Sequence, residues 1–469
     1  MKILVFGTGD YYQRYKNFFI EDIVGFIDNN ESKQGTFQDG IEIMSPVRAV
    51  SINYDRIYVL SVFYKEMTNQ LLELGIKKEK IFSPTEVVKL LRAENKHLPI
   101  TIVTEDRKNL ILAENKKNVL ILTPNLRLNG AVIALLGAVR ACVKNGFDVT
   151  VGAFQTGAAQ DILVRQYGVK VVIDENLLFC TMRDTKWVQN SSVILCNTIF
   201  MYQFLSERNK GIPIIWWLHD PPYVYETIDH NVTKDIDFSD VKAFGAGRIA
   251  GAAFDKEFSG IHSDILLYGL EDSPGNKQIA DNCFNVITVG EIQDWKGQDI
   301  FCEAAKKVLS SIKKQVTDKR HCLKIRFLLI GNDTTKFASV LKAKYAEFPE
   351  IQFLGIFSRA EMRDIYNHTN LYICPSREET MSITVTEAMM KNIPCIVSDA
   401  AGIADFVHNE TDGLLFHAEH ADDLAQKLSW CLSNREKIEE MGRKGRKIFE
   451  RNFSERVFEE HFMKIMKNI

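Results

Sequence analysis

Residues 374–398 read CPSREETMSITVTEAMMKNIPCIVS, the most informative part of the sequence. The apolar run NLYICPS (370–376) predicts a strand that leads into it, and a polar loop follows. We expect a helix that starts near Ser382 or Thr384 and ends at Asn392, a residue that tolerates the left-handed C-cap conformation. Pro394 then opens a second strand. A strand, a helix and a strand in this order predict a parallel α/β sheet.

Two glutamates lie on either side of the expected helix start. Glu379 lies on the loop before the helix and Glu387 on its second turn, so both can face the mouth of the sheet, where α/β folds bind ligands. The amides at the start of the helix lack intrahelical partners and therefore suit a phosphate. A carboxylate two turns along can accept hydrogen bonds from a ribose diol.

The same alternation of strands and helices extends in both directions along the chain. After residue 117 the order repeats twice, and a shorter unit with the runs KILVFG, IVGFIDNN and RIYVLSV precedes it. We predict a small Rossmann-like domain, a linker, two larger α/β domains and a C-terminal helix that packs back on the first of the two. The predicted segments are residues 1–95, 96–116, 117–272, 273–452 and 453–469.

The composition is that of an ordinary globular protein. Of 469 residues, 46% are hydrophobic and 25% charged, which excludes disordered, collagen-like and disulfide-scaffold classes. The formal net charge of −3 argues against nucleic acid as a partner. Nine cysteines form no CxxC pair and predict reduced thiols in a cytoplasmic protein. The opening MKILVFGTG does not fit a signal peptide, and the apolar run 131–143 is too short to span a bilayer.

The stretch 374–398 resembles the Glu-x7-Glu motif of retaining GT-B glycosyltransferases, above all the GT4 family of bacterial sugar transferases. The resemblance implies an α/β fold of GT-B architecture, with two Rossmann-like domains facing a cleft, here with an extra small N-terminal Rossmann-like domain. It covers about residues 117 to 460. The supporting motifs are LTPNLRLNGAV (122–132), WWLHDPP (216–222), LLYGLED (266–272), VGEIQDWKGQDIFCEAAKKV (289–308), FLLIGND (327–333), FLGIFSRAEM (353–362) and DAAGIADFVHNETDGLLF (399–416).

The resemblance implies catalytic roles for three residues. Glu379 would approach the hydroxyls of the donor sugar, and His219 would contact that sugar from the N-terminal half. Lys296, with the helix-start amides, would stabilise the departing diphosphate by fixed electrostatics. Donor binding would fall to Glu387 on the ribose and to further residues at the diphosphate and the nucleobase: Thr380, Met381, Ser382, Ile383, Gly130 and Ile356.

The chain departs from the family pattern at two places. Relatives commonly carry arginine directly after the glycine of the diphosphate turn, where this chain has Glu291, so either another cation acts there or Glu291 points away. The loop after the first glutamate is usually Gly-Phe-Gly, but here it is residues 380–382, Thr-Met-Ser. Plainer interpretations stay open as well: Lys296 as an ordinary turn lysine, His219 as a strand-end histidine, and the tryptophans at 216–217 as core.

The N-terminal unit carries part of a dinucleotide-binding pattern. Gly7 and Gly9 follow a strand, and Asp28 ends the next strand at the spacing that suits a ribose-binding acid. Tyr12 stands where the third glycine belongs and would crowd the helix against the strand. A nucleotide site at Gly7, Gly9 and Asp28 and a purely structural domain both remain open, and NAD chemistry is not expected.

The resemblance to GT4 glycosyltransferases implies the function. The protein would transfer a sugar from a nucleotide diphosphate sugar to a hydroxyl acceptor with retention of configuration. The acceptor would be a glycan or lipid-linked saccharide in bacterial surface polysaccharide synthesis. We expect no cofactor beyond the co-substrate and, since no DxD pair is evident, no metal. The alternatives are a non-catalytic nucleotide-sugar sensor or subunit, and a GT-B epimerase or phosphorylase.

The C-terminal tail is compatible with two locations of the protein, in the cytoplasm or in the cytoplasm at the inner face of the membrane. Residues 435–469 are expected to be helical, with an apolar stripe at Phe458, Phe462 and Ile465. A basic cluster beside the stripe is either a solvated face or a contact with the inner face of a membrane. The sequence leaves the oligomeric state, the donor base and the sugar undetermined. The cluster comprises Arg443, Lys444, Arg446 and Lys447.

Overall fold

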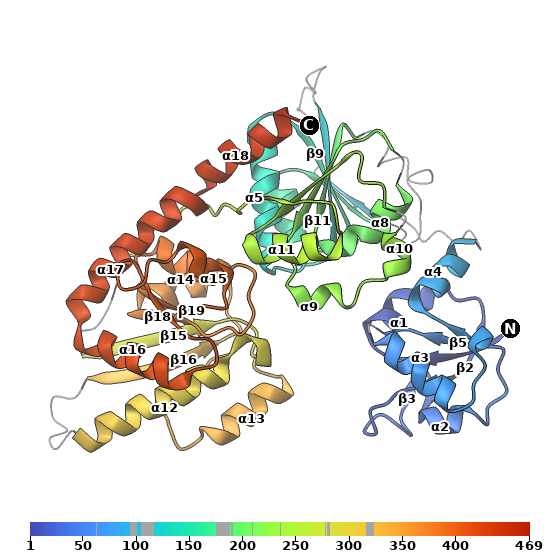
Figure 1. Ribbon diagram of the computed structural model, residues 1–469, viewed down its shortest axis with the longest axis horizontal. Coiled ribbons are helices and arrows are strands. Elements are labelled where there is room, and N and C mark those ends of the chain that lie inside the picture. Colours follow the sequence, from blue (N-terminus) through green and yellow to red (C-terminus); the bar gives the residue numbers. More distant parts are fainter. Residues whose placement is uncertain are drawn as a thin grey trace. The chain divides into compact units, whose positions relative to one another are not determined.

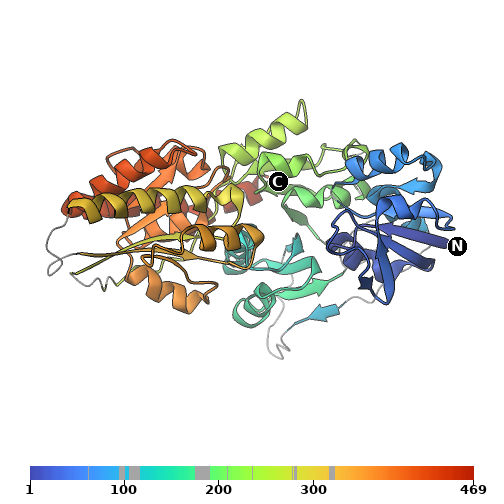
Figure 2. The ribbon, with the colours of Figure 1, turned by 90° about the horizontal axis from the view of Figure 1, so that it is seen from below.

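The computed structural model (Figures 1 and 2) describes residues 1–61, 63–93, 101–104, 117–174, 188, 191–208, 210–234, 236–276, 278, 282–315 and 323–469. The chain divides into two compact units. The first comprises residues 1–128, 142–216 and 223–242, and the second comprises 129–141, 217–222 and 243–469.

The N-terminal residues form a six-stranded sheet in the order β3-β4-β2-β1-β5-β6. All its strand pairs are parallel except β3 with β4. In Figure 2 the light-blue helices α3 and α4 lie along one side of the dark-blue strands. The elements are β1 Lys2–Phe6, α1 Asp10–Tyr15, β2 Asp22–Ile27, β3 Phe37–Gln38, β4 Ile41–Met44, α2 Pro46–Ala49, β5 Arg56–Val59, α3 Tyr64–Glu73, β6 Ile81–Phe82 and α4 Pro84–Ala93.

The middle of the chain forms an eight-stranded sheet in the order β14-β13-β12-β11-β8-β9-β10-β7. Its central strands are the continuous apolar runs that the sequence predicts, because parallel strands are buried on both faces. The elements used below are β8 Asn118–Asn125, α5 Gly130–Lys144, β9 Asp148–Gln155, β10 Lys170–Ile173, β11 Val193–Asn197, α8 Tyr202–Glu207, β12 Ile214–Leu218, β13 Val241–Gly245, α11 Arg248–Glu257 and β14 Asp264–Ile265.

The segment 96–116, expected as a linker, contributes a strand to this sheet. Strand β7, Thr101–Val103, pairs antiparallel with β10. Two of its three side chains are exposed, so it lacks the apolar run by which the other strands are recognised. The remainder of that segment, 96–100 and 105–116, lies outside the described residues.

The C-terminal sheet has six strands in the order β17-β16-β15-β18-β19-β20, and all its pairs are parallel. Figure 1 shows α12 and α16 on one face and α14 and α15 on the other. The elements are β15 Cys283–Val289, α12 Gln298–Gln315, β16 Lys324–Ile330, α13 Lys336–Lys344, β17 Ile351–Phe353, α14 Arg359–Asn367, β18 Leu371–Cys374, α15 Ile383–Met390, β19 Cys395–Ser398, β20 Leu414–Phe416 and α16 Ala421–Ser433.

The tail is helical but not a single helix. Helix α17, Arg435–Ile448, continues as a π-helical turn to Phe453, and the extended residue Ser454 separates it from α18, Glu455–Lys467. Phe458 and Phe462 are buried, and the Phe458 ring stacks on Trp217 with 5.5 Å between centroids. Much of the predicted apolar stripe therefore packs inside the protein. The contact with a membrane remains a hypothesis.

Seven of the nine cysteines lie among the described residues, and each of these is a free thiol. Six of them are buried, as the apolar runs around them predict. None of the described helices has the length and apolar character needed to cross a membrane.

Candidate functional site

The site is built around the loop that enters α15. Ser382 is the N-cap of this helix and accepts a hydrogen bond from the amide of Val385, as a helix start at this serine requires. The amides of Met381, Ser382 and Ile383 donate to no acceptor among the described residues. The helix ends at Met390, slightly earlier than predicted, and Asn392 adopts the left-handed conformation with φ of 58°. The predicted set of free helix-start amides is therefore present.

Lys296 forms an ion pair with Glu379 at the edge of this loop. The lysine ends a short turn whose next residue, Gly297, is left-handed with φ of 67°. A Cβ at Gly297 would lie 1.9 Å from the carbonyl oxygen of Pro375, so only glycine lets the turn approach the end of β18. The turn thus brings together a cation and a carboxylate that lie 83 residues apart in the chain.

A second glycine, missed in the sequence, fixes the backbone of the same loop. The amide of Gly402 donates to the carbonyl of Glu379 at 2.8 Å. A Cβ at Gly402 would lie 2.0 Å from the carbonyl oxygen of Thr380. The segment DAAGIADF stands out in the sequence only through its resemblance, and nothing in its spacing indicates this close approach.

His219 joins the site through the backbone. Its carbonyl accepts a hydrogen bond of 2.9 Å from the hydroxyl of Thr380. The Nε2 atom of His219 is buried and has no hydrogen-bond partner among the described residues. Burial lowers the pKa of the imidazole to about 3, so the ring is neutral near pH 7. A neutral imidazole with one unsatisfied nitrogen can exchange a hydrogen bond with a bound hydroxyl.

Two further glycines approach the loop before α15. A Cβ at Gly130, the first residue of α5, would lie 3.7 Å from Cδ1 of Ile383. At Gly247 a Cβ would lie 2.7 Å from the Cε atom of Met381. Gly130 is predicted to bind the donor at the diphosphate, and this role stays a prediction; sequence reasoning missed Gly247.

Glu387 lies on the buried side of the second turn of α15. The hydroxyl of Tyr366 donates to its Oε2 at 3.0 Å. Burial raises the pKa of Glu387, and the hydrogen bond from Tyr366 and the charges of Arg359 and Lys391 oppose that rise only in part. Tyr366 comes from α14 and is itself 2% exposed, and sequence reasoning missed it. A carboxylate held in this way keeps Oε1 for a ligand hydroxyl.

The two residues predicted at the diphosphate turn and the nucleobase take different positions. Glu291 is exposed and accepts a hydrogen bond of 3.3 Å from Nδ2 of Asn332. Its side chain is thereby directed to the neighbouring loop, one of the two arrangements that the sequence left open. Ile356 follows β17 and is 76% exposed, so its apolar surface is available for a contact.

The tryptophans before His219 are core residues, as the plainer interpretation holds. Trp216 and Trp217 are each fully buried, and their indole nitrogens donate to the carbonyls of Thr198 and Leu266. Among the described residues, no group of three or more His, Cys, Asp or Glu side chains could hold a metal ion. Metal independence of the reaction stays a prediction.

Comparison with known proteins identifies two segments of the chain. Residues 271–448 match the family described as Glycosyl transferases group 1, and residues 1–82 match the family described as C2185-like, N-terminal. The first segment contains Lys296, Glu379 and Glu387 and ends with α17, the first helix of the tail. The match to the glycosyl transferases group 1 family thus covers the segment in which these three residues lie.

Curated relatives match over limited lengths. Sulfoquinovosyl transferase SQD2 of Arabidopsis thaliana is 28% identical over 29% of this chain and 27% of its own length. The D-inositol 3-phosphate glycosyltransferase of Gordonia bronchialis is 26% identical over 37% and 40%. The N,N'-diacetylbacillosaminyl-diphospho-undecaprenol alpha-1,3-N-acetylgalactosaminyltransferase of Campylobacter jejuni is 25% identical over 24% and 29%. The chain thus spans well under half the length of these relatives.

Solved structures match over most of the chain. Anabaena Alr3699/HepE in complex with UDP-glucose gives a TM-score of 0.59 at 15% identity, over 75% of this chain and all of the other. Sucrose-phosphate synthase of Thermosynechococcus elongatus gives 0.62 at 15% identity, over 75% and 99%. These likenesses confirm the predicted GT-B fold.

Proposed function

We propose that the protein is a retaining glycosyltransferase of the GT4 type, which moves a sugar from a nucleotide diphosphate sugar to a hydroxyl acceptor. The observation that carries the proposal is the Lys296–Glu379 ion pair next to the free amides at the start of α15. A cation, a carboxylate and a set of oriented N–H groups meet there within one loop. The segment that matches the glycosyl transferases group 1 family includes all three.

The leaving group would be stabilised by fixed positive charge. When the bond between the anomeric carbon and the diphosphate breaks, negative charge develops on the phosphate oxygens. The amides of residues 381–383 and the ammonium of Lys296 are held in place before the reaction, so they stabilise that charge without reorganising. Lys296 would supply the charge that a divalent cation supplies elsewhere, and the proposed reaction needs no metal and no cofactor.

The donor would be held at both ends. Glu387, oriented by Tyr366, would accept hydrogen bonds from the ribose, and the exposed side chain of Ile356 would contact the nucleobase. At the other end, the unsatisfied Nε2 of His219 and the carboxylate of Glu379 would bind hydroxyls of the sugar. Satisfying a buried nitrogen that otherwise lacks a partner favours ligand binding.

The proposed stereochemistry follows from attack on the face that the leaving group occupies. The acceptor oxygen forms a bond to the anomeric carbon as the bond to the phosphate oxygen breaks, and the acceptor proton passes to the departing phosphate. No covalent glycosyl-enzyme forms in this scheme. Detection of a sugar adduct on any residue by mass spectrometry during turnover would overturn it.

The proposed acceptor is a glycan or a lipid-linked saccharide of a bacterial surface polysaccharide. The name of the Campylobacter jejuni relative includes a diphospho-undecaprenol acceptor, which supports this class. The enzyme would act in the cytoplasm, with contact at the inner face of the membrane through the basic residues of α17. Release of the protein from anionic vesicles at all salt concentrations would argue against that contact.

A non-catalytic nucleotide-sugar sensor is the second candidate, and the loop before α15 favours it. Thr380 and Met381, which replace the usual glycine and phenylalanine, are nearly buried and fill space beside the loop. A sensor would bind the donor without transfer or slow hydrolysis. An epimerase, in contrast, would convert the donor without any acceptor.

The first test is thermal stability against a panel of nucleotides and nucleotide sugars, with Glu387→Ala alongside. A ligand at ~100 times its dissociation constant stabilises the folded protein by ~2.7 kcal/mol. A shift for one base, lost in Glu387→Ala, supports the donor site. Turnover of the same donor with and without acceptors then separates a transferase, an epimerase and a sensor.

A further inference from the structure

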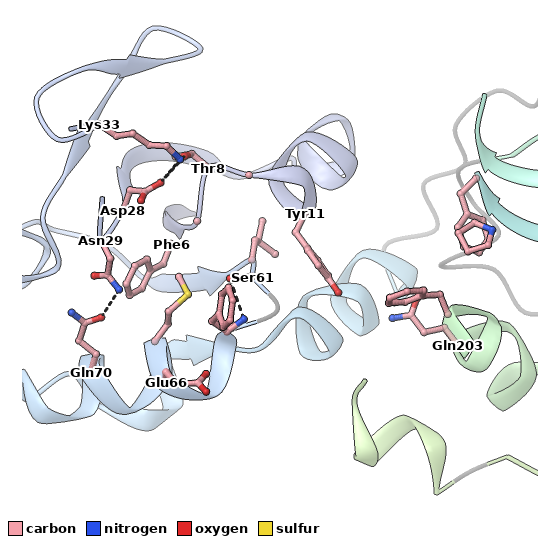
Figure 3. A pocket seen from close by; sticks show the side chains of 18 of the residues that line it. Phe6, Thr8, Tyr11, Asp28, Asn29, Lys33, Ser61, Glu66, Gln70 and Gln203 are labelled. Carbon is pink, nitrogen blue, oxygen red and sulfur yellow. Dashed lines mark hydrogen bonds and ion pairs between the residues drawn. The ribbon is translucent and has the colours of Figure 1, made fainter. Parts of the chain in front are cut away.

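A cavity that the proposed reaction does not use lies between the N-terminal sheet and residues of the middle of the chain, namely Pro124, Asn125, Phe154, Phe200, Tyr202 and Gln203. The cavity has a volume of about 1010 Å³, and all the residues that line it belong to the first compact unit. Pockets of ~300–1,000 Å³ hold small organic ligands, so this one has room for a nucleotide. The N-terminal lining includes Thr8, Asp28, Lys33, Ser61, Glu66 and Gln70 (Figure 3).

The cavity lies where α/β sheets bind ligands. The first strand, β1, has β2 on one side and β5 on the other, so the direction in which strands are added reverses at this point. Gly7 follows β1, Asp28 follows β2 and Ser61 lies two residues after β5. This part of the lining thus comes from the carboxyl ends of the strands at the switch point, where crevices form in open parallel sheets.

Three polar side chains converge on one wall. The Thr8 hydroxyl donates to Oδ2 of Asp28 at 2.7 Å, and the ammonium of Lys33 lies 2.9 Å from the same oxygen. The other carboxylate oxygen accepts from the amide of Asn30 at 2.9 Å. Figure 3 shows Thr8, Asp28 and Lys33 pointing toward one another, with Glu66 and Gln70 on α3.

The carboxylate of Asp28 has about four acceptor positions, and these three donors occupy three of them. If Lys33 turns to a ligand phosphate, one position becomes free on each oxygen. Two adjacent acceptors on one carboxylate match the two adjacent hydroxyls of a ribose. The side chain of Lys33 is 43% exposed and that of Asp28 only 14%, so the lysine is the partner that can move.

The glycines of this edge have different requirements. Gly7 has φ of 107°, and a Cβ there would lie 2.6 Å from the carbonyl oxygen of Leu60, so glycine is needed for the fold. Gly9 has an ordinary φ of −84°, and a Cβ there would meet nothing within 4 Å. The space in front of Gly9 is therefore open to a ligand.

The missing third glycine of the dinucleotide pattern does not close the cavity. Tyr12, which takes its place, packs edge-on against Phe26 with 4.8 Å between centroids. Its hydroxyl donates to Asp39 at 2.7 Å, so the side chain is anchored away from the lining. The predicted crowding of helix against strand is accommodated by this packing.

We infer that the N-terminal domain binds a nucleotide at this cavity, with the ribose hydroxyls on Asp28 and a phosphate on Lys33, separately from the donor site. Glu66 places a further negative charge on the lining, which disfavours ligands with many phosphates. The site is therefore assigned to nucleoside monophosphates or to diphosphate diesters such as nucleotide sugars. The assignment rests on the cavity and does not depend on the proposed transfer.

The test uses the full chain with Glu387→Ala, in which the donor site is impaired, and isothermal titration with AMP, UMP, UDP-glucose and NAD. We expect one-to-one binding of at least one probe. Gly9→Phe should weaken it at least tenfold by filling the open space, and Lys33→Met should weaken it at least tenfold by removing the cation. The 2′,3′-dideoxy form of a bound monophosphate should also bind at least tenfold more weakly.

Controls separate this inference from loss of folding and from the donor site. Lys77→Ala, an exposed change in the same domain, should leave binding unchanged, and thermal stability should match between it and Gly9→Phe. If Gly9→Phe proves unstable, Lys33→Met decides. The inference is overturned if binding survives both variants, or if no probe binds the Glu387→Ala protein. Loss of sugar transfer alone leaves the inference intact.

Discussion

Two sheets of this molecule each carry a lysine paired with a carboxylate at the carboxyl ends of their parallel strands, next to a threonine. In the C-terminal sheet the pair is Lys296–Glu379, followed by Thr380, and in the N-terminal sheet it is Lys33–Asp28, beside Thr8. At the C-terminal edge the backbone of Glu379 is fixed by a hydrogen bond to its carbonyl. Helix α15, which follows, begins with free amides. At the N-terminal edge the carboxylate itself is fixed, by Thr8 and by the amide of Asn30.

The difference indicates which group is free to meet a ligand. The loop that carries Glu379 is held through the carbonyl of that residue, by the amide of Gly402, while its carboxylate pairs with Lys296. The carboxylate of Asp28 is held by two donors besides Lys33, and it is the less exposed member of that pair. The first arrangement suits a reaction in which charge changes, and the second suits recognition of a ligand that leaves unchanged.

Breaking the Lys296–Glu379 pair should change activity more than any other substitution considered below. Lys296→Ala should lower kcat of sugar transfer by ~10²–10³-fold, because it removes a preorganised cation from the departing diphosphate. Steady-state kinetics with a saturating donor measures it. Lys307→Ala, which breaks an exposed pair with Asp422, is the matched control and should leave kcat unchanged. A drop of less than threefold in Lys296→Ala would refute the assigned role.

The next effect contrasts two glycines of the N-terminal edge. Gly7→Ala should destabilise the N-terminal sheet by ~1–3 kcal/mol, since alanine is strained at φ of 107° and meets the carbonyl of Leu60. Gly9→Ala should change its stability by less than ~0.5 kcal/mol. Hydrogen exchange of peptides from β1 and β5 reports both values. Equal protection in the two variants would mean that the edge is looser than its geometry indicates.

A third prediction concerns the pH dependence of donor binding. In the proposed site the ribose hydroxyls bind the ionised form of Glu387, and burial raises the pKa of this carboxyl above its ordinary value. Affinity for UDP-glucose should therefore rise with pH, by up to ~10-fold per unit, and become constant above the pKa of Glu387. His219, with its pKa lowered to about 3, contributes no change between pH 5 and 8. Glu387→Gln should flatten the profile, and an unaltered profile would contradict the assignment.

A weaker effect on the same pH dependence is expected when the partner of Glu387 is changed. Tyr366→Phe removes a hydrogen bond that lowers the pKa of Glu387, so the midpoint of the pH profile should move to higher pH. Donor affinity at neutral pH should fall by ~2–10-fold, about the net value of one ordinary hydrogen bond. Tyr345→Phe, which removes a hydroxyl bonded to Glu303, should leave the profile in place. A midpoint that moves equally in both variants would point to a general effect on the domain.

The sequence predicts those features that depend on local patterns. Buried parallel strands are continuous apolar runs, so β15, β16 and β18 stand out, and Ser382 marks the start of α15 because a serine before an apolar helix caps it. Strand β13 escapes notice because VKAFG contains a lysine and ends in glycine. Strand β7 escapes because only three residues pair.

Features that depend on distant contacts could not be predicted. Tyr366 reaches Glu387 across 21 residues, and a tyrosine on an amphipathic helix gives no sign of that partner. Gly402 is indistinguishable in the sequence from a loop glycine until its close approach to Thr380 is known. The direction of Glu291 likewise depends on Asn332, which lies on the following loop.

Three aromatic rings connect α18 to the candidate site. Phe458 stacks on Trp217, whose indole lies 4.7 Å from the imidazole of His219 between ring centroids. If Phe458 were displaced, the indole of Trp217 would face an empty apolar space. The imidazole of His219, which packs against that indole, would then be held less firmly. A fusion partner or an antibody that displaces α18 would therefore disturb the packing around His219, the residue proposed to contact the sugar.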